Sequence, residues 1–143
     1  MQSNFYFIGN YSNIYKKPSK LSEVTSQIIC GEKFKILSKN KSWIKIKLLF
    51  DNYVGYIQTK QFTQKTNLNY KVNNLKAKIF KKPNVRTKSY LTFGSKLSAL
   101  DENKNYIKIQ KNKWIKKTDI KKLDYNATNF VEIFKKFLNV KYV

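Results

Sequence analysis

The sequence contains very few side chains that could carry out catalysis. Its 143 residues include one cysteine, Cys30, and no histidine. A thiol or hydroxyl nucleophile normally needs a neighbouring base, most often histidine, to become reactive. Zinc sites draw on several Cys and His ligands, so we expect no metal and no other cofactor. The chain as written is therefore not expected to be a complete enzyme, and it cannot form an internal disulfide.

Lysine dominates the charged side chains. Lysine and arginine total 30 against 8 acidic residues, a formal net charge of +22, and Arg86 is the sole arginine. This excess predicts attraction to polyanions such as nucleic acid, anionic lipid or acidic wall polymer. A single arginine offers only one guanidinium group for bidentate hydrogen bonds to bases or phosphates, so such binding would be non-specific. Compositional drift toward Lys, Asn, Ile, Tyr and Phe explains the charge equally well, so both explanations stay open.

The length and the apolar content bound the size of the fold. A chain of 143 residues with 41% hydrophobic and 15% aromatic residues is long enough for one ordinary domain or two small ones, and apolar enough for a packed core. The N-terminus lacks the cationic start and apolar stretch of a secretory signal. No run approaches the roughly 20 apolar residues of a membrane span. We expect a cytoplasmic protein, with the cell envelope as the alternative.

One pattern occurs twice along the chain. Segment 13–18 (NIYKKP) is matched by segment 78–83 (KIFKKP), in which an apolar residue, an aromatic residue, two lysines and a proline follow in the same order. In each copy a glycine, Gly31 or Gly94, then opens a stretch of alternating apolar and polar residues. These are signals of a turn followed by a strand.

The later part of each copy also predicts strands. Segments 43–47 (WIKIK) and 106–110 (YIKIQ) alternate strictly, which is typical of a half-buried strand with its lysines on the solvated face. Each copy closes with a short aromatic strand, at 55–57 and at 113–115, after a polar turn. About five short strands with polar turns predict a small closed or nearly closed β-barrel in each copy.

The remaining segments divide the chain into regions. We place the first domain at 1–64, a polar linker rich in Asn, Gln and Thr at 65–74, and the second domain at 75–125. Segment 126–143 changes to helical periodicity, so it predicts an amphipathic helix. Its apolar positions are Phe130, Val131, Ile133, Phe134, Phe137 and Leu138.

With both copies laid out, the sequence resembles the N-terminal half of bacterial NlpC-family cell-wall endopeptidases of the dipeptidyl-peptidase VI type. The resemblance rests on 14–15 with Pro18, on 27–32 (QIICGE), on 43–46 (WIKI) and on 51–57 (DNYVGYI). The second copy departs more, since it has no glycine before its closing tryptophan. The resemblance implies a mainly β fold of two small SH3-like β-barrels in tandem plus the C-terminal helix.

The end of the chain resembles the helix and strand that open the catalytic domain of this family. The motif with the nucleophilic cysteine would follow, and the sequence stops before it. We therefore expect helix 126–143 to open a missing catalytic domain. Cys30 falls in an SH3-like strand instead, so we interpret it as a small core or half-buried residue.

The resemblance also implies a ligand. Members of the family cleave between γ-D-glutamate and the diamino acid of peptidoglycan peptides, and their first SH3-like domain selects peptides with a free N-terminal L-alanine through a tyrosine and a carboxylate. By motif position the candidates are Tyr53 and Glu23, since a carboxylate facing an ammonium group forms a charge-assisted hydrogen bond. The alternatives are a turn aromatic that covers the barrel end and a solvated loop carboxylate.

Aromatic residues recur at matching positions of the two copies. We interpret them as core residues of small barrels, with a stacking platform for sugars or bases as the alternative. They are Tyr15, Trp43, Phe80 and Trp114.

The sequence thus predicts non-catalytic modules that recognise a peptidoglycan-derived peptide and work with a catalytic domain in cis or in trans. A second hypothesis is a basic module that holds an anionic polymer, either wall polymer or nucleic acid, without specificity. A third is a piece of a split or truncated peptidase with no activity of its own.

Overall fold

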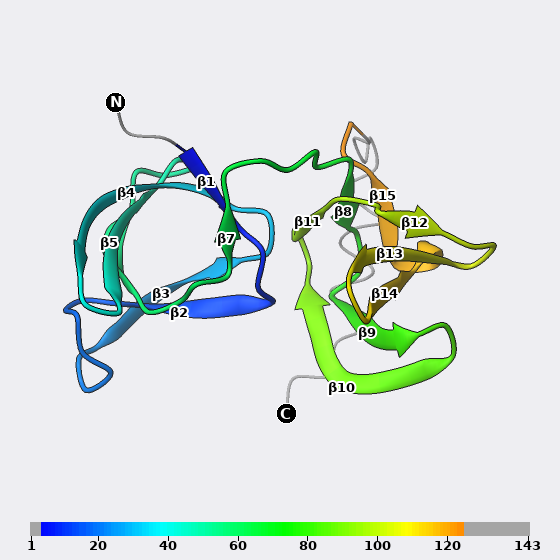
Figure 1. Ribbon diagram of the computed structural model, residues 1–143, viewed down its shortest axis with the longest axis horizontal. Helices are drawn as coiled ribbons and strands as arrows, with labels where there is room; N and C mark the ends of the chain where they lie inside the picture. The colour runs from blue at the N-terminus through cyan, green and yellow to red at the C-terminus, as the bar shows by residue number, and fades with distance from the viewer. Residues whose placement is uncertain (1–3, 125–143) are drawn as a thin grey trace. The chain divides into compact units, whose positions relative to one another are not determined.

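The computed structural model describes residues 4–124, which divide between two compact units, Met1–Asn67 and Leu68–Val143 (Figure 1). The predicted helix at 126–143 lies outside the described residues. Within 4–124 the elements are strands and one short 3₁₀ helix, η1 (Lys117–Asp119), so the mainly β prediction is confirmed for this part. No helix there is long and apolar enough to cross a membrane.

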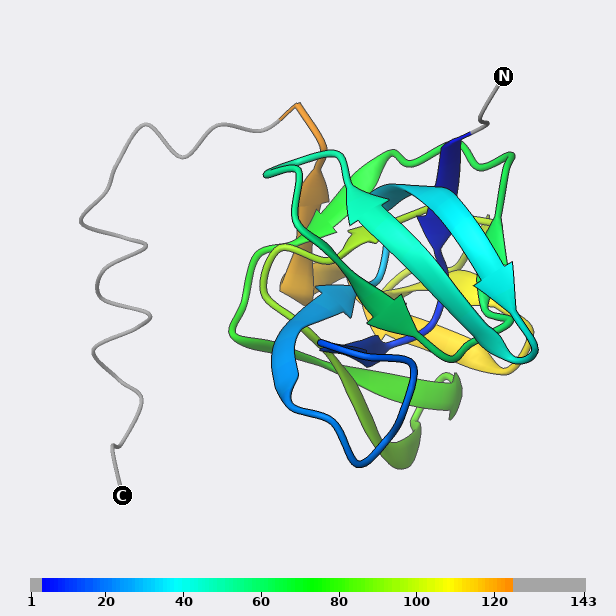
Figure 2. The same ribbon diagram turned by 90° about the vertical axis from the view of Figure 1, so that its left-hand side faces the viewer.

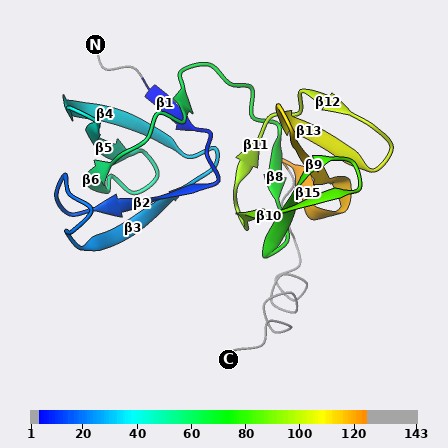
Figure 3. The same ribbon diagram turned by 60° about the horizontal axis from the view of Figure 1, so that its bottom comes forward.

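The first unit is one antiparallel sheet in the order β3-β2-β6-β5-β4-β1-β7. Its strands are β1 (Asn4–Phe7), β2 (Tyr11–Tyr15), β3 (Val24–Ile29), β4 (Lys33–Asn40), β5 (Trp43–Leu48), β6 (Val54–Ile57) and β7 (Phe62–Thr63). Figure 2 shows the long β4–β5 hairpin in cyan and turquoise, and Figure 3 shows β2 and β3 side by side.

The prediction of a barrel is wrong in one respect, because the sheet curls without closing. In Figure 1 the first unit looks almost like a ring, but the strand order begins at β3 and ends at β7, and these two edge strands do not pair. The last strand, β7, is only two residues long and pairs with β1 alone. Among the described residues it is therefore an edge strand of this sheet.

Alternation along β5 explains the core of the first unit. Ile44, Ile46 and Leu48 are buried, while the intervening lysines lie on the other face, as the period-two pattern predicts. The inward-facing side chains of most strands of the sheet form one buried cluster. Its members are Phe7, Ile14, Ile28, Phe34, Ile44, Ile46, Leu48 and Ile57.

The second unit contains two sheets, of orders β10-β9-β14-β13-β12 and β11-β8-β15, and neither is closed. Its strands are β8 (Tyr70–Val72), β9 (Lys76–Lys82), β10 (Val85–Thr92), β11 (Lys96–Leu97), β12 (Asp101–Glu102), β13 (Tyr106–Gln110), β14 (Lys113–Lys116) and β15 (Ile120–Lys122). Register shifts along β10 accompany the sharp bend of this strand in Figure 1.

Strand β8 falls inside the segment 65–74 that the sequence predicts to be a linker. It is the central strand of the three-stranded sheet, between β11 and β15, and Val72 is buried. β8 has only three residues, so it is too short to show the alternation of apolar and polar residues by which a strand is predicted from sequence. The residues around it are polar. Linker character therefore does not extend through 70–72.

The internal repeat is confirmed by matching backbone contacts. Gly31 donates its N–H to the carbonyl of Phe7 at 2.7 Å, and Gly94 donates to the carbonyl of Val72 at 3.1 Å. Both glycines have φ of 87°, a left-handed conformation that residues with a Cβ rarely adopt. The same turn thus opens the same strand in both copies.

The repeated aromatic residues do not lie in the core cluster of the first unit, which corrects our interpretation of Tyr15 and Trp43. These two rings are half-buried on the opposite sheet face and meet edge to face at 5.4 Å between centroids. The equivalent pair in the second unit, Phe80 and Tyr106, meets at 5.1 Å and is buried. Trp114 is half-buried and pairs with Phe80 across the strands. Alternation sends residues next to the core isoleucines to the outer face, where aromatic rings pack on each other.

Candidate functional site

The two residues singled out in the first unit lie at the same end of its sheet. Glu23 is exposed just before β3, and its carbonyl accepts a hydrogen bond from the N–H of Lys16 at 2.9 Å. Strand β2, which precedes Lys16, pairs with β6, and Tyr53 comes directly before β6. Glu23 and Tyr53 are thus separated by two strand spacings, on the order of 10 Å.

Tyr53 is held more firmly than Glu23. Its ring is half-buried and packs against the core cluster, and its carbonyl accepts from the N–H of Leu48 at 2.8 Å. Its own N–H donates to Oδ1 of Asp51 at 3.1 Å, which closes the turn. The aromatic body is therefore fixed, whereas the carboxylate of Glu23 stands on an exposed loop.

Two large apolar side chains border this end of the sheet and face solvent. Leu21, in the loop before Glu23, is 99% exposed, and Phe50, in the turn before Tyr53, is 95% exposed. An acid, a tyrosine and exposed apolar loops could contact a peptide or another domain.

Cys30 lies apart from this end of the sheet. It is buried at 6% exposure, which confirms its interpretation as a core or half-buried residue, although it stands in the turn just after β3 instead of in the strand. Within residues 4–124 no cluster of three or more His, Cys, Asp or Glu side chains could hold a metal ion.

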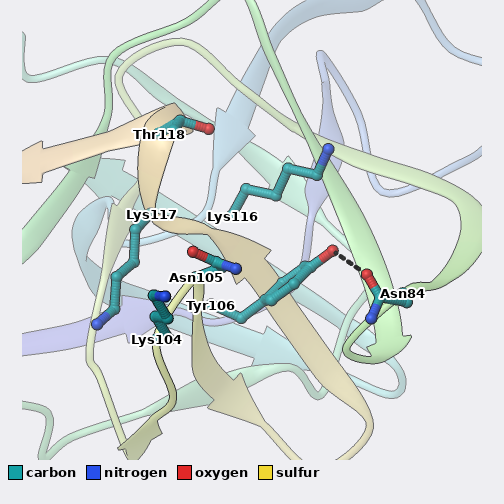
Figure 4. A pocket seen from close by; sticks show the side chains of 7 residues that line it. All are labelled: Asn84, Lys104, Asn105, Tyr106, Lys116, Lys117 and Thr118. Atoms are coloured by element: carbon teal, nitrogen blue, oxygen red, sulfur yellow. Dashed lines mark hydrogen bonds between the residues drawn. The ribbon is translucent and has the colours of Figure 1, made fainter.

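The second unit contains a cavity of about 510 Å³ that sequence reasoning missed (Figure 4). Three segments distant in sequence meet there: the β9–β10 turn, the β12–β13 turn and the end of β14 with η1. The lining consists of lysines, amides, a hydroxyl and a phenol, with no carboxylate. The lining residues are Asn84, Lys104, Asn105, Tyr106, Lys116, Lys117 and Thr118.

Hydrogen bonds hold the walls of this cavity in place. The Tyr106 hydroxyl donates to Oδ1 of Asn84 at 3.2 Å, drawn as a dashed line in Figure 4, so the amide NH₂ of Asn84 stays available as a donor. The carbonyl of Asn105 accepts from the N–H of Lys117 at 2.9 Å. The side chain of Asn103 accepts from the N–H of Tyr106 at 2.8 Å. A cationic, donor-rich cavity of this kind suits an anion.

The sequence does contain a signal for this cavity, but a weak one. Lys104 lies in the β12–β13 turn and Lys116 ends β14, at positions where the first copy has Lys41 and Gln58. Only the pairing of Tyr106 with Lys116 across β13 and β14 shows that the two segments meet.

Comparison with known proteins finds one family model that matches part of the chain, within the first unit. Residues 14–62 match the family model of the bacterial dipeptidyl-peptidase SH3 domain. No curated protein is significantly similar to the chain in sequence. The expectation of a nucleic-acid partner gains no support from these comparisons.

A solved structure of a bacterial protein shares the fold. An NlpC/P60 family protein from Bacillus cereus superposes with a TM-score of 0.63 at 15% identity, over 83% of this chain and 56% of its own. This chain therefore spans little more than half of that protein, and the low identity shows likeness of fold alone. More distant matches are NlpC2 from Trichomonas vaginalis (TM-score 0.39, 16% identity, 90% of this chain and 52% of its own) and the endolysin LysPBC5 CBD (TM-score 0.35, 16% identity, 85% and 93%).

Proposed function

We propose, from the premise that residues 14–62 form a bacterial dipeptidyl-peptidase SH3 domain, that this chain is a non-catalytic accessory part of a cell-wall peptidase. The observation that carries the proposal is this family match, together with a fold shared with an NlpC/P60 protein. The peptidase is a γ-D-glutamyl-diamino-acid endopeptidase of the NlpC family, and its catalytic domain acts in cis or in trans. It works in the cytoplasm on recycled wall peptides, or in the cell envelope.

The recognition site of this proposal is the end of the first sheet that carries Glu23 and Tyr53. The Glu23 carboxylate accepts hydrogen bonds from the free N-terminal ammonium of a wall peptide. Tyr53 supplies a fixed aromatic wall and a hydroxyl, since its ring is anchored on the core. Support comes from the placement of the two residues at one sheet end.

The test is calorimetric titration of the whole chain with L-Ala-γ-D-Glu-diaminopimelate, and with the same peptide acetylated at its N-terminus. We expect the free peptide to bind on the order of tenfold more tightly, because acetylation removes the charge that faces Glu23. Glu23→Gln is expected to abolish this preference, and Tyr53→Phe to weaken binding of both peptides.

The matched control is Glu32→Gln, which removes one carboxylate of the same unit away from this sheet end. Equal affinity for free and acetylated peptide, or the same preference in Glu23→Gln and in the unaltered chain, would contradict the assignment of Glu23. Peptide binding that appears only after a catalytic domain is added would place recognition in the assembled enzyme.

One observation favours a second function, the binding of an anionic polymer. The net charge of +22 is accompanied by a cavity whose charged lining residues are all lysines. Binding by diffuse charge weakens steeply as salt rises, whereas binding of a peptide through a single ion pair responds mildly. Titration at low and at high salt therefore separates the two functions.

A further inference from the structure

A second cavity adjoins the one beside Tyr106. This neighbouring cavity has a volume of about 220 Å³ and shares Lys116 and Thr118 with the first. Its lining residues are Lys76, Lys78, Phe80, Arg86, Lys116, Thr118 and Asp119. The outer face of the second unit thus has two adjoining hollows joined at Lys116.

Positive charge dominates both hollows. Six cationic side chains line them, including Arg86, the sole arginine of the chain. The one carboxylate in the lining, that of Asp119, accepts a hydrogen bond from Nδ2 of Asn74 at 2.6 Å. Glu102 lies just outside and pairs with Lys117 at 3.2 Å. The cations therefore clearly outnumber the acids that could neutralise them.

The floor between the hollows is aromatic. Nζ of Lys116 lies 5.6 Å from the centroid of the Phe80 ring, and Phe80 packs edge to face on Tyr106. Lys116 itself is half-buried. An ammonium group beside buried rings is less surrounded by water than one on an open strand, so its attraction for an anion is stronger.

The first unit carries different side chains at the positions that correspond to part of this lining. The positions of Lys116 and Lys117 correspond to Gln58 and Thr59. Nε2 of Gln58 donates to Oγ of Ser42 at 2.6 Å, a hydrogen bond between two polar side chains at the place where the second unit has its cavity. The two lysines at this place are therefore particular to the second copy.

We propose that the second unit binds a ligand with two oxyanion groups, one in each hollow, with Lys116 between them. In the larger hollow Lys104, Lys116 and the Asn84 amide donate to one oxyanion. In the smaller one Arg86 contacts the other in a bidentate manner, as guanidinium groups do with carboxylate and phosphate. This site is independent of the peptide site proposed at Glu23 and Tyr53, because its residues all belong to the other unit.

The test follows the amide signals of the ¹⁵N-labelled full chain while sodium tripolyphosphate, glutarate or a dT oligonucleotide is added. With tripolyphosphate or glutarate, we expect saturable shifts at both hollows: at residue 84, at 104–106 and at 116–118 around the larger one, and at 76, 78 and 86 around the smaller one. Tighter binding of tripolyphosphate assigns the site to phosphate groups, and tighter binding of glutarate assigns it to carboxylates.

Point variants decide whether the binding is local. Lys116→Gln and Arg86→Gln are each expected to weaken binding on the order of tenfold, as loss of a charge-assisted hydrogen bond does. Lys116→Arg should keep most of the affinity. The matched control is Lys122→Gln, which removes the same charge from an exposed position of β15 that lines neither hollow.

Three results would overturn the proposal. The first is an equal loss in Lys116→Gln and Lys122→Gln, which would show binding by diffuse charge. The second is shifts spread over all the lysines without saturation. The third is dT oligonucleotide binding that is tightest of all and sensitive to Lys116→Gln, which would reassign the hollows to nucleic acid. Unchanged thermal unfolding of each variant verifies that the fold is intact.

Discussion

At the scale of single residues, Gly55 shows why the first unit needs a glycine beside a core strand. A Cβ built on Gly55 would overlap Cγ2 of Ile14 and lie 3.2 Å from the carbonyl oxygen of Tyr15. Ile14 is fully buried in the core cluster, and Tyr15 O belongs to the neighbouring backbone, so neither can easily move. The glycine therefore permits the close approach of β2 and β6.

We predict that Gly55→Ala destabilises the protein by about 1–3 kcal/mol, the usual cost of forcing an extra methyl group into a packed core. Urea unfolding, followed by tryptophan fluorescence, measures the change. The control is Val54→Ala on the adjacent exposed position, for which a change within about 0.5 kcal/mol is expected. A Gly55→Ala protein as stable as the control would show that β2 and β6 separate freely.

The single cysteine also belongs to this scale. Its burial, and the absence of histidine from the sequence, both argue against a thiol nucleophile at this position. Because its side chain is buried, we interpret Cys30 as a structural residue of the first unit.

At the scale of elements, the alternating strands of the second copy carry its core. In β13, Ile107 and Ile109 are buried, whereas Lys108 between them lies on the outer face opposite Trp114. Ile107 also lies opposite Ile115 of β14, which is fully buried. The inner face of this hairpin therefore packs tightly while its outer face builds the floor of the cationic hollows.

We predict that Ile107→Ala lowers the free energy of unfolding by about 2–5 kcal/mol, since it removes a fully buried side chain and leaves a cavity. Lys108→Ala, one residue along the same strand, should cost less than about 1 kcal/mol. Thermal unfolding by circular dichroism compares the two variants. Similar losses in both would mean that the strand does not present one face to a core.

At the scale of the whole molecule, charge is the dominant property. A net charge of +22 on 143 residues means that lysines repel one another throughout the folded chain. In dilute salt this repulsion acts over about 30 Å, and at 1 M salt it is screened within about 3 Å. Because the folded state is more compact than the unfolded one, this repulsion destabilises the folded state more.

We therefore predict that the urea midpoint of unfolding rises when sodium chloride is increased from about 10 mM to about 500 mM. Urea is uncharged, so it does not itself screen the lysines. A second series with the charge-reducing variant Lys122→Gln should show a smaller rise. A midpoint that falls with salt would mean that attractive ion pairs outweigh the repulsion.

The sequence by itself determined the repeated β pattern, the faces of its alternating strands, the turn glycines and the absence of histidine. These are local properties, since the alternation of side chains along a strand and the left-handed conformation of a turn glycine depend on neighbouring residues. It also pointed to the family whose model residues 14–62 match. Only the tertiary structure decided that β3 and β7 do not pair with each other, that β8 is a strand within a polar segment, and that Arg86, Lys104 and Lys116 line adjoining hollows. These features depend on pairing between strands that are far apart in the sequence. The local pattern of apolar and polar residues does not specify which strands pair.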